Sequence, residues 1–178
     1  MALRMRTHTE YDFQHVEELQ RVVSKAVTAS VTKRSRISSA AWGVCALTAM
    51  TFMIARGFSM IFAVILGALG LFLIARSLFY YKFVTFGILQ TMDKEVTGSD
   101  YLLEKSYMLV TNPKSSTQYA YSDCYRLLET EGNLYYIMKN GQGLILDKTN
   151  LKGGSVDELR DWMEAKCGKK AEWMGKKK

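Results

Sequence analysis

The segment MIARGFSMIF, residues 53–62, lies in the middle of the most apolar part of the chain. Between residues 37 and 75 the only charged side chain is that of Arg56. One helix over this stretch would be about 58 Å long at about 1.5 Å per residue, nearly twice the roughly 30 Å hydrocarbon core of a bilayer. Two helices, each close to the ~20 residues that one crossing needs, fit it better. We therefore predict a transmembrane helical hairpin that turns at Arg56.

The predicted spans are residues 37–55 and 58–75, joined by an external turn at residues 56–57. Gly57 permits a tight reversal because glycine adopts backbone conformations that other residues avoid. The long Arg56 side chain can extend to the headgroups. The alternative is a buried hairpin in the core of a soluble protein, but a chain of 178 residues offers too little structure to cover two such apolar helices.

Basic residues predict the orientation of the hairpin. They cluster before the first span, ending at Arg36, and return after the second at Arg76, whereas the turn holds Arg56 alone. Cytoplasmic flanks of membrane helices carry the excess of Lys and Arg, so both termini are predicted to be cytoplasmic. Arg36, Arg56, Gly57 and Arg76 then mark the membrane boundaries.

Small residues on the second span predict how the two helices pack. Ala63 and Gly67 form a small-xxx-small face, which lets helix backbones approach closely. We expect this face to pack against Ala41, Cys45 or Ala49 of the first helix, and dimerisation is the alternative.

The segments flanking the hairpin are predicted to be an N-terminal region, residues 1–36, and a juxtamembrane helix or linker, residues 76–97. In the first, a short strand at residues 3–7 precedes an amphipathic helix from about residue 10 to residue 35 that continues into the first span. Thr9 and Asp12 resemble a capping box at its start.

Residues 98–168 differ from the apolar stretch in composition. They contain short β-favouring runs separated by turn signals such as Asn140–Gly143, and these runs predict strands followed by one helix. Ser155 and Glu158 form a capping box for that helix, and Gly168 is its predicted stop. The fold class is therefore an α+β membrane protein: a two-helix hairpin plus a small cytoplasmic antiparallel sheet, a meander closed by a C-terminal helix on a pleckstrin-homology-like plan.

Two segments carry a family resemblance: TQYAYSDCYRLLETEGNLYYIM, residues 117–138, and LILDKTNLKGGSVDELRDWMEAK, residues 144–166. Together with the order of elements, they resemble the YcxB-like family of bacterial membrane proteins, over nearly the whole chain. The resemblance implies a multi-pass protein of the bacterial plasma membrane whose activity is not established. It offers no catalytic residues to carry over.

No catalytic constellation stands out. Asp123 is expected to cap an Asx turn and Asp147 to form a loop ion pair, rather than to serve acid–base chemistry. The absence of histidine from the C-terminal half excludes a histidine-dependent triad there. Three separated cysteines without a CxxC pair indicate neither a zinc site nor a disulfide framework. We predict that the chain is not an enzyme and uses no metal or cofactor.

Two segments are candidate anion sites. The KGGS segment, Lys152, Gly153, Gly154 and Ser155, precedes a helix N-terminus, where backbone N–H groups can hold an anion; ordinary capping is the alternative. The basic tail, residues 169–178, is the second, and a solvated end is its alternative. Its candidate contacts to anionic lipid are Lys169, Lys170, Trp173, Lys176, Lys177 and Lys178.

These patterns favour a membrane-anchored, non-enzymatic cytoplasmic binding or scaffold module. The alternative is an accessory subunit of a transporter or other membrane complex that acts through the hairpin. Expected partners are the lipid bilayer together with anionic headgroups or a membrane or cytoplasmic protein. Nucleic acid is not expected, since the membrane anchor makes the tyrosine-rich strands poor candidates for base stacking.

Overall fold

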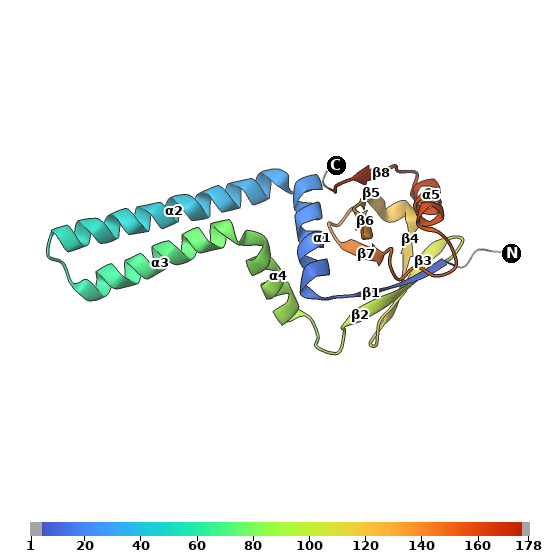
Figure 1. Cartoon of the computed structure of the whole chain (residues 1–178), viewed down its shortest axis with the longest axis horizontal. Coiled ribbons are helices and arrows are strands. Elements are labelled where there is room, and N and C mark those ends of the chain that lie inside the picture. The colour runs from blue at the N-terminus through green and yellow to red at the C-terminus, as the bar shows by residue number, and fades with distance from the viewer. Residues whose placement is uncertain (1–4, 176–178) are drawn as a thin grey trace. The chain divides into compact units, whose positions relative to one another are not determined.

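The computed structural model describes residues 5–175 and divides into two compact units (Figure 1). We call residues 24–87 the hairpin unit, and residues 5–23 together with 88–175 the sheet unit. The described chain is α+β, with helices α1 (Phe13–Ala26), α2 (Ala29–Ala55), α3 (Met60–Leu78), α4 (Tyr80–Thr91) and α5 (Val156–Cys167).

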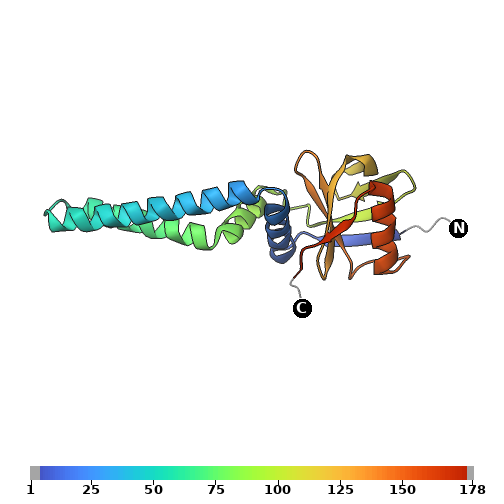
Figure 2. The same cartoon turned by 90° about the horizontal axis from the view of Figure 1, so that it is seen from above.

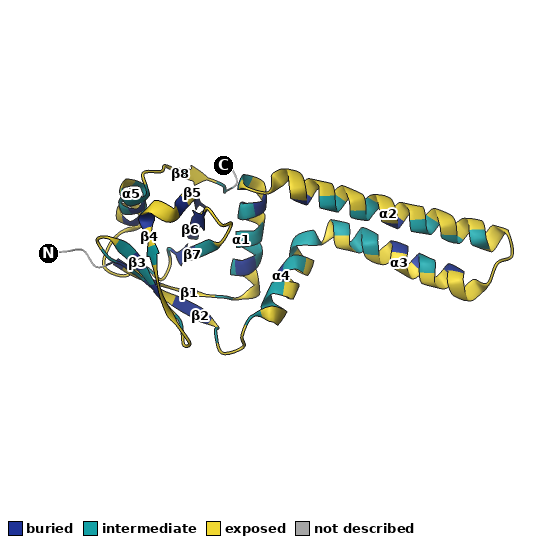
Figure 3. Ribbon diagram, turned by 180° about the vertical axis from the view of Figure 1, so that it is seen from behind, coloured by how far each residue is buried: buried dark blue, intermediate teal, exposed yellow. Residues whose placement is uncertain are grey.

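The hairpin unit is built on α2 and α3, which lie side by side and are both long and apolar enough to cross a membrane. Arg56 ends α2, and Gly57 follows with a φ of 71°, so the reversal falls at the residues that the sequence indicated. Large apolar side chains cover the outside of the pair: Ile61 is 72% exposed and Val64 66% (Figure 3). Surfaces of this kind are rare on soluble monomers.

The chain before the hairpin differs from the single long helix that was expected. α1 ends at Ala26 and a new helix begins at Ala29. Across the break, the Ser24 hydroxyl donates a hydrogen bond to Thr32 Oγ1 at 2.8 Å, which stabilises the bend. Thr9 does not cap a helix, because it belongs to a strand; Asp12 Oδ1 instead accepts a bond from the His15 N–H at 2.7 Å.

The sheet unit contains two four-stranded sheets rather than the single sheet that was expected. The first has the order β1 (Met5–Glu10), β2 (Gly98–Leu103), β3 (Tyr107–Thr111) and β4 (Ser116–Ala120); the second has the order β7 (Gly143–Asp147), β6 (Asn133–Met138), β5 (Cys124–Glu129) and β8 (Ala171–Trp173). A 3₁₀ turn, Tyr121–Asp123, carries the chain from one sheet to the other. The buried Tyr121 fixes this turn by donating a hydrogen bond to the Glu104 carbonyl.

Strand β1 joins segments from opposite sides of the hairpin. It pairs antiparallel with β2, so that Glu10 lies opposite Gly98. Its inward threonines reach β7: Thr7 Oγ1 donates to the Asp147 carbonyl, and Thr9 Oγ1 donates to the Ile145 carbonyl at 2.7 Å. The Asp147 N–H donates in turn to Thr9 Oγ1 at 3.2 Å. The edge strands of the two sheets are thereby fastened to each other.

The core of the sheet unit lies between the sheets and α5 (Figure 2). The completely buried side chains include those of Tyr101, Leu127, Leu134, Leu146, Leu159 and Met163. The capping box predicted for α5 is confirmed, since Ser155 Oγ accepts from the Glu158 N–H at 3.2 Å and the Ser155 N–H donates to Glu158 Oε2 at 2.7 Å. Gly168 ends the helix with a φ of 62°, also as predicted.

A buried ion pair lies at the end of the second sheet where β5 and β7 terminate. Lys148 Nζ lies 2.6 Å from Glu129 Oε1 and donates another bond to the Thr130 carbonyl. Both charged side chains are only 7% exposed. The Trp173 ring on β8 lies 5.8 Å from Lys148 Nζ, so the strand after α5 helps to cover the pair.

Replacing Thr9 with valine should lower the free energy of unfolding of the sheet unit by about 2 kcal/mol, because the Ile145 carbonyl and the Asp147 N–H would be left buried without partners. Denaturant unfolding of the full chain in detergent, followed by near-ultraviolet circular dichroism, measures the change. Thr117→Val on the exposed strand β4 is the control and should shift stability by less than about 0.5 kcal/mol. Equal effects of the two variants would contradict this role of Thr9.

Candidate functional site

The two long helices approach closely along a seam of small residues. Ala63, Gly67 and Gly70 of α3 are buried, and a Cβ placed on Gly70 would lie 2.9 Å from the Gly43 carbonyl oxygen of α2. A Cβ on Gly67 would lie 2.5 Å from the Met50 sulfur. The small face of α3 therefore packs within the hairpin.

The residues of α2 that meet this face are not those that were expected. Ala41, Cys45 and Ala49 are exposed, whereas α2 brings Gly43, Leu47 and Met50 to the seam. The reason is the glycine at residue 43, which allows the closest approach of the two backbones. Since α2 covers Ala63 and Gly67, this face is not free for another protein.

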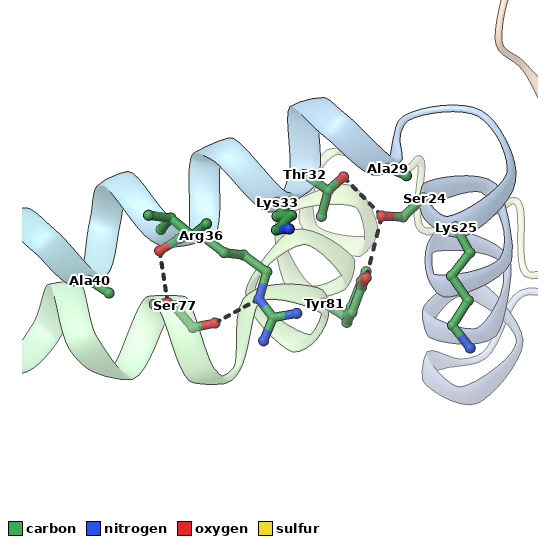
Figure 4. Close-up of a pocket in the computed structure, with 10 residues that line it drawn as sticks. Ser24, Lys25, Ala29, Thr32, Lys33, Arg36, Ala40, Ser77 and Tyr81 are labelled. Carbon is green, nitrogen blue, oxygen red and sulfur yellow. Dashed lines mark hydrogen bonds between the residues drawn. The ribbon is translucent and has the colours of Figure 1, made fainter.

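A cavity of about 380 Å³ opens at the end of the hairpin opposite the turn (Figure 4). All of its lining residues belong to the hairpin unit. They come from the end of α1, the first turns of α2, the end of α3 and the start of α4, and are Ser24, Lys25, Ala29, Thr32, Lys33, Arg36, Ile37, Ala40, Ser77 and Tyr81. We call this the root cavity.

Hydrogen bonds shape the wall of the root cavity. Arg36 Nε donates to the Ser77 carbonyl at 3.1 Å, and Ser77 Oγ donates back to the Arg36 carbonyl at 2.8 Å. The Arg36 guanidinium also lies 5.9 Å from the centre of the Tyr81 ring. Figure 4 shows Arg36 reaching from α2 across to α3. These bonds hold the two helices together where the apolar stretch begins.

The root cavity is positively charged. Lys25, Lys33 and Arg36 line it, and none of the ten residues drawn in Figure 4 is acidic. Within the described chain, neither lysine forms an ion pair with a carboxylate. The cavity also borders the N-terminus of α2, whose first turn holds no acidic residue and whose N-cap, Thr28, makes no capping bond. A helix N-terminus carries partial positive charge, so all of these groups favour an anion.

Arg56 and Arg76, the other charged residues predicted to mark the membrane boundaries, do not lie together in one site. The Arg56 guanidinium lies 5.2 Å from the centre of the Phe52 ring at the turn. Arg76 is exposed in the last turn of α3 and does not line the root cavity.

The KGGS segment is organised by capping rather than by an open anion site. The Ser155 N–H is already bonded to the Glu158 carboxylate. The Lys152 N–H and carbonyl are paired with the main chain of Arg6 at 2.8 and 2.9 Å. A negative side chain thus occupies the place where an anion would bind.

The described part of the tail, residues 169–175, is bonded to the rest of the sheet unit. Lys170 Nζ lies 2.5 Å from Glu164 Oε2, and this hydrogen bond lowers the pKa of Glu164 below its usual value. Trp173 belongs to β8, which pairs parallel with β5, while Lys169 is exposed. The predicted contacts Lys176, Lys177 and Lys178 lie outside the described residues.

The candidate carboxylates are separate structural groups. Asp147 is buried, and its Oδ1 accepts bonds from the Thr149 N–H and hydroxyl, both at 2.7 Å. Its Oδ2 accepts a bond from Asn150, so Asp147 forms the Asx turn and not the loop ion pair that was expected. Asp123 is exposed in the 3₁₀ turn. Across residues 5–175, no cluster of three or more His, Cys, Asp or Glu side chains is placed to hold a metal ion.

Sequence reasoning missed two groupings. Cys124 at the start of β5 and Cys167 at the end of α5 are brought together, and a hydrogen bond from the Cys167 thiol lowers the pKa of Cys124 and raises that of Cys167. The root cavity was also missed, although its three cations, Lys25, Lys33 and Arg36, all precede the first span in the sequence. Their placement around one cavity depends on the bend between α1 and α2, which helical periodicity does not reveal.

No family model matches the chain, and no curated protein matches it. The fold therefore defines the class of protein by itself: an α+β chain with a pair of long apolar helices and a two-sheet unit closed by a C-terminal helix.

Replacing Gly70 with leucine should force α2 and α3 apart, because no space exists between its Cα and the Gly43 carbonyl, and should destabilise the hairpin by about 1–3 kcal/mol. Ala68→Leu is the control, since Ala68 is exposed on the same helix. Spin labels on cysteines at Thr48 and Leu71, in a background without the native cysteines, report the separation of the helices. An unchanged label distance in the Gly70 variant would refute the seam.

Proposed function

We propose that the chain is a membrane-anchored, non-enzymatic binding or scaffold module. In this proposal α2 and α3 cross the bilayer twice, and the sheet unit lies on the cytoplasmic side, where it engages a protein partner or anionic lipid. The bacterial plasma membrane is the proposed location.

The observation that carries the proposal is the pairing of β1 with β2. The chain leaves the sheet unit after Glu10 and returns at Gly98, opposite the point where it left. A segment that leaves and returns on one side of a membrane crosses it an even number of times. Two apolar helices satisfy this condition, and both ends of the sheet unit then share one side.

The surface of the hairpin also supports insertion. Its helices expose isoleucine, valine, leucine and phenylalanine and bury few of their apolar residues, as is expected of helices in a lipid environment. Basic residues flank the end near Arg36 and Arg76, and this asymmetry supports a cytoplasmic position for that end.

Two finer assignments belong to the same proposal. Two sheets fastened at β1 and β7 and closed by α5 support a pleckstrin-homology-like plan for the sheet unit. The order of strand, helix, hairpin, strands and closing helix supports membership of the YcxB-like family. The placement of the two candidate carboxylates supports the non-enzymatic part of the proposal, since Asp147 is bonded within its own turn and Asp123 is exposed in the 3₁₀ turn.

A role as an accessory subunit of a transporter or other membrane complex is the alternative. Its contact cannot use Ala63 and Gly67, because α2 covers them. The outer faces of α2 and α3 would have to supply the contact.

The orientation is tested with single cysteines in a background without native cysteines, using a membrane-impermeant maleimide on spheroplasts. Ser59→Cys in the turn should be labelled in intact spheroplasts, because the turn is external. Ser122→Cys, exposed on the sheet unit, should be labelled only after the membrane is opened. Both cysteine variants should remain in the membrane fraction after a sodium carbonate wash.

Release of the chain from the membranes by carbonate would contradict the proposal that the hairpin anchors it. Labelling of Ser122→Cys in intact spheroplasts with protection of Ser59→Cys would overturn the orientation while leaving the anchor in place. Labelling of both positions in intact spheroplasts would contradict the two-crossing arrangement.

A further inference from the structure

We propose that the root cavity is a binding site for the phosphate group of an anionic phospholipid. The inference rests on the proposed membrane anchor and names the ligand that the cytoplasmic end of the hairpin would hold. Phosphate is the shared chemistry, and it could be presented by a lipid or by a free ion.

The cationic side chains of the cavity match a phosphate. Arg36 is anchored through Nε to the Ser77 carbonyl at 3.1 Å and through its position beside the Tyr81 ring, so its guanidinium is oriented before a ligand arrives. A guanidinium held in this way presents planar donors that suit phosphate oxygens. Lys25 and Lys33 add two further positive charges to the lining of the same cavity.

Neutral donors complete the wall. The Ser24, Thr32 and Tyr81 hydroxyls form a connected set, with Ser24 Oγ 2.8 Å from Thr32 Oγ1 and 3.3 Å from the Tyr81 hydroxyl. Such hydroxyls can rotate to donate to an acceptor-rich group. The uncapped N-terminus of α2 contributes further positive potential beside Ala29.

The order of polar and apolar residues along the cavity favours a lipid over a free ion. On the side toward the hairpin turn the wall changes to Ile37 and Ala40, the first residues of the apolar stretch. A phospholipid carries its phosphate and its acyl chains in that same order along the membrane normal. A basic cavity between membrane helices on the cytoplasmic side is a recognised setting for anionic headgroups.

The experiment uses the full chain in neutral detergent and counts bound lipid by native mass spectrometry. The probes are phosphatidylglycerol, phosphatidylcholine and inorganic phosphate. The test variant is Lys25→Gln with Lys33→Gln, because neither lysine fastens one helix to another, unlike Arg36. The charge-matched control is Arg76→Gln with Lys82→Gln, two exposed residues of the hairpin unit outside the cavity.

The native chain should bind phosphatidylglycerol in preference to phosphatidylcholine. The test variant should lose at least about tenfold in apparent affinity for phosphatidylglycerol, because it removes two of the three positive side chains that line the cavity. The control variant should keep the native affinity, and inorganic phosphate should not displace the lipid at matched concentration.

Equal losses in the two variants would overturn the site, because general surface charge would then explain binding. Displacement by inorganic phosphate at matched concentration would overturn the lipid as the ligand and assign the cavity to a free ion. Failure of the membrane anchor itself appears separately, as release of the otherwise native chain from membranes by the sodium carbonate wash.

Discussion

The pairing of β1 with β2 is the constraint on which the rest of the structure depends. Without it, β1 would be a free N-terminal strand and the first sheet would lack its edge. With it, Thr7 and Thr9 can reach the main chain of β7 and fasten the two sheets together. The same pairing places the segments that precede and follow the hairpin unit along the chain opposite each other within the sheet unit.

The two ends of the hairpin are built on different principles. At the turn, Gly57 adopts a left-handed conformation, and a Cβ placed there would meet no atom within 4 Å. At the root, polar side chains from successive helices converge, and the reciprocal Arg36–Ser77 bonds connect α2 to α3. Between these ends the helices rely on close packing at Gly43 and Gly70. The polar contacts between α2 and α3 are therefore found at the end of the hairpin opposite the turn.

Local signals in the sequence were sufficient for some elements and not for others. The turn at Arg56-Gly57 and the Ser155–Glu158 capping box depend on a few adjacent residues, and both appear as predicted. The division into two sheets falls at the 3₁₀ turn, where Tyr121 donates to the Glu104 carbonyl, a contact that no local pattern encodes. Thr9 looked like a helix cap because its spacing to Asp12 fits one, but its place opposite β7 decides its role. The root cavity needs three-dimensional convergence of four helices and was beyond the reach of periodicity.

The separation of β1 from β2 along the chain has a consequence for biosynthesis. Tyr11 and Ser99, whose side chains share a hydrogen bond at 2.9 Å, are 88 residues apart. At roughly 5–20 residues per second, the ribosome needs about 4–18 s to make what lies between them. The first strand therefore waits, exposed, until the whole hairpin has been synthesised. The sheet unit can therefore be completed only after the hairpin has been made, because β1 has no partner strand until β2 follows it.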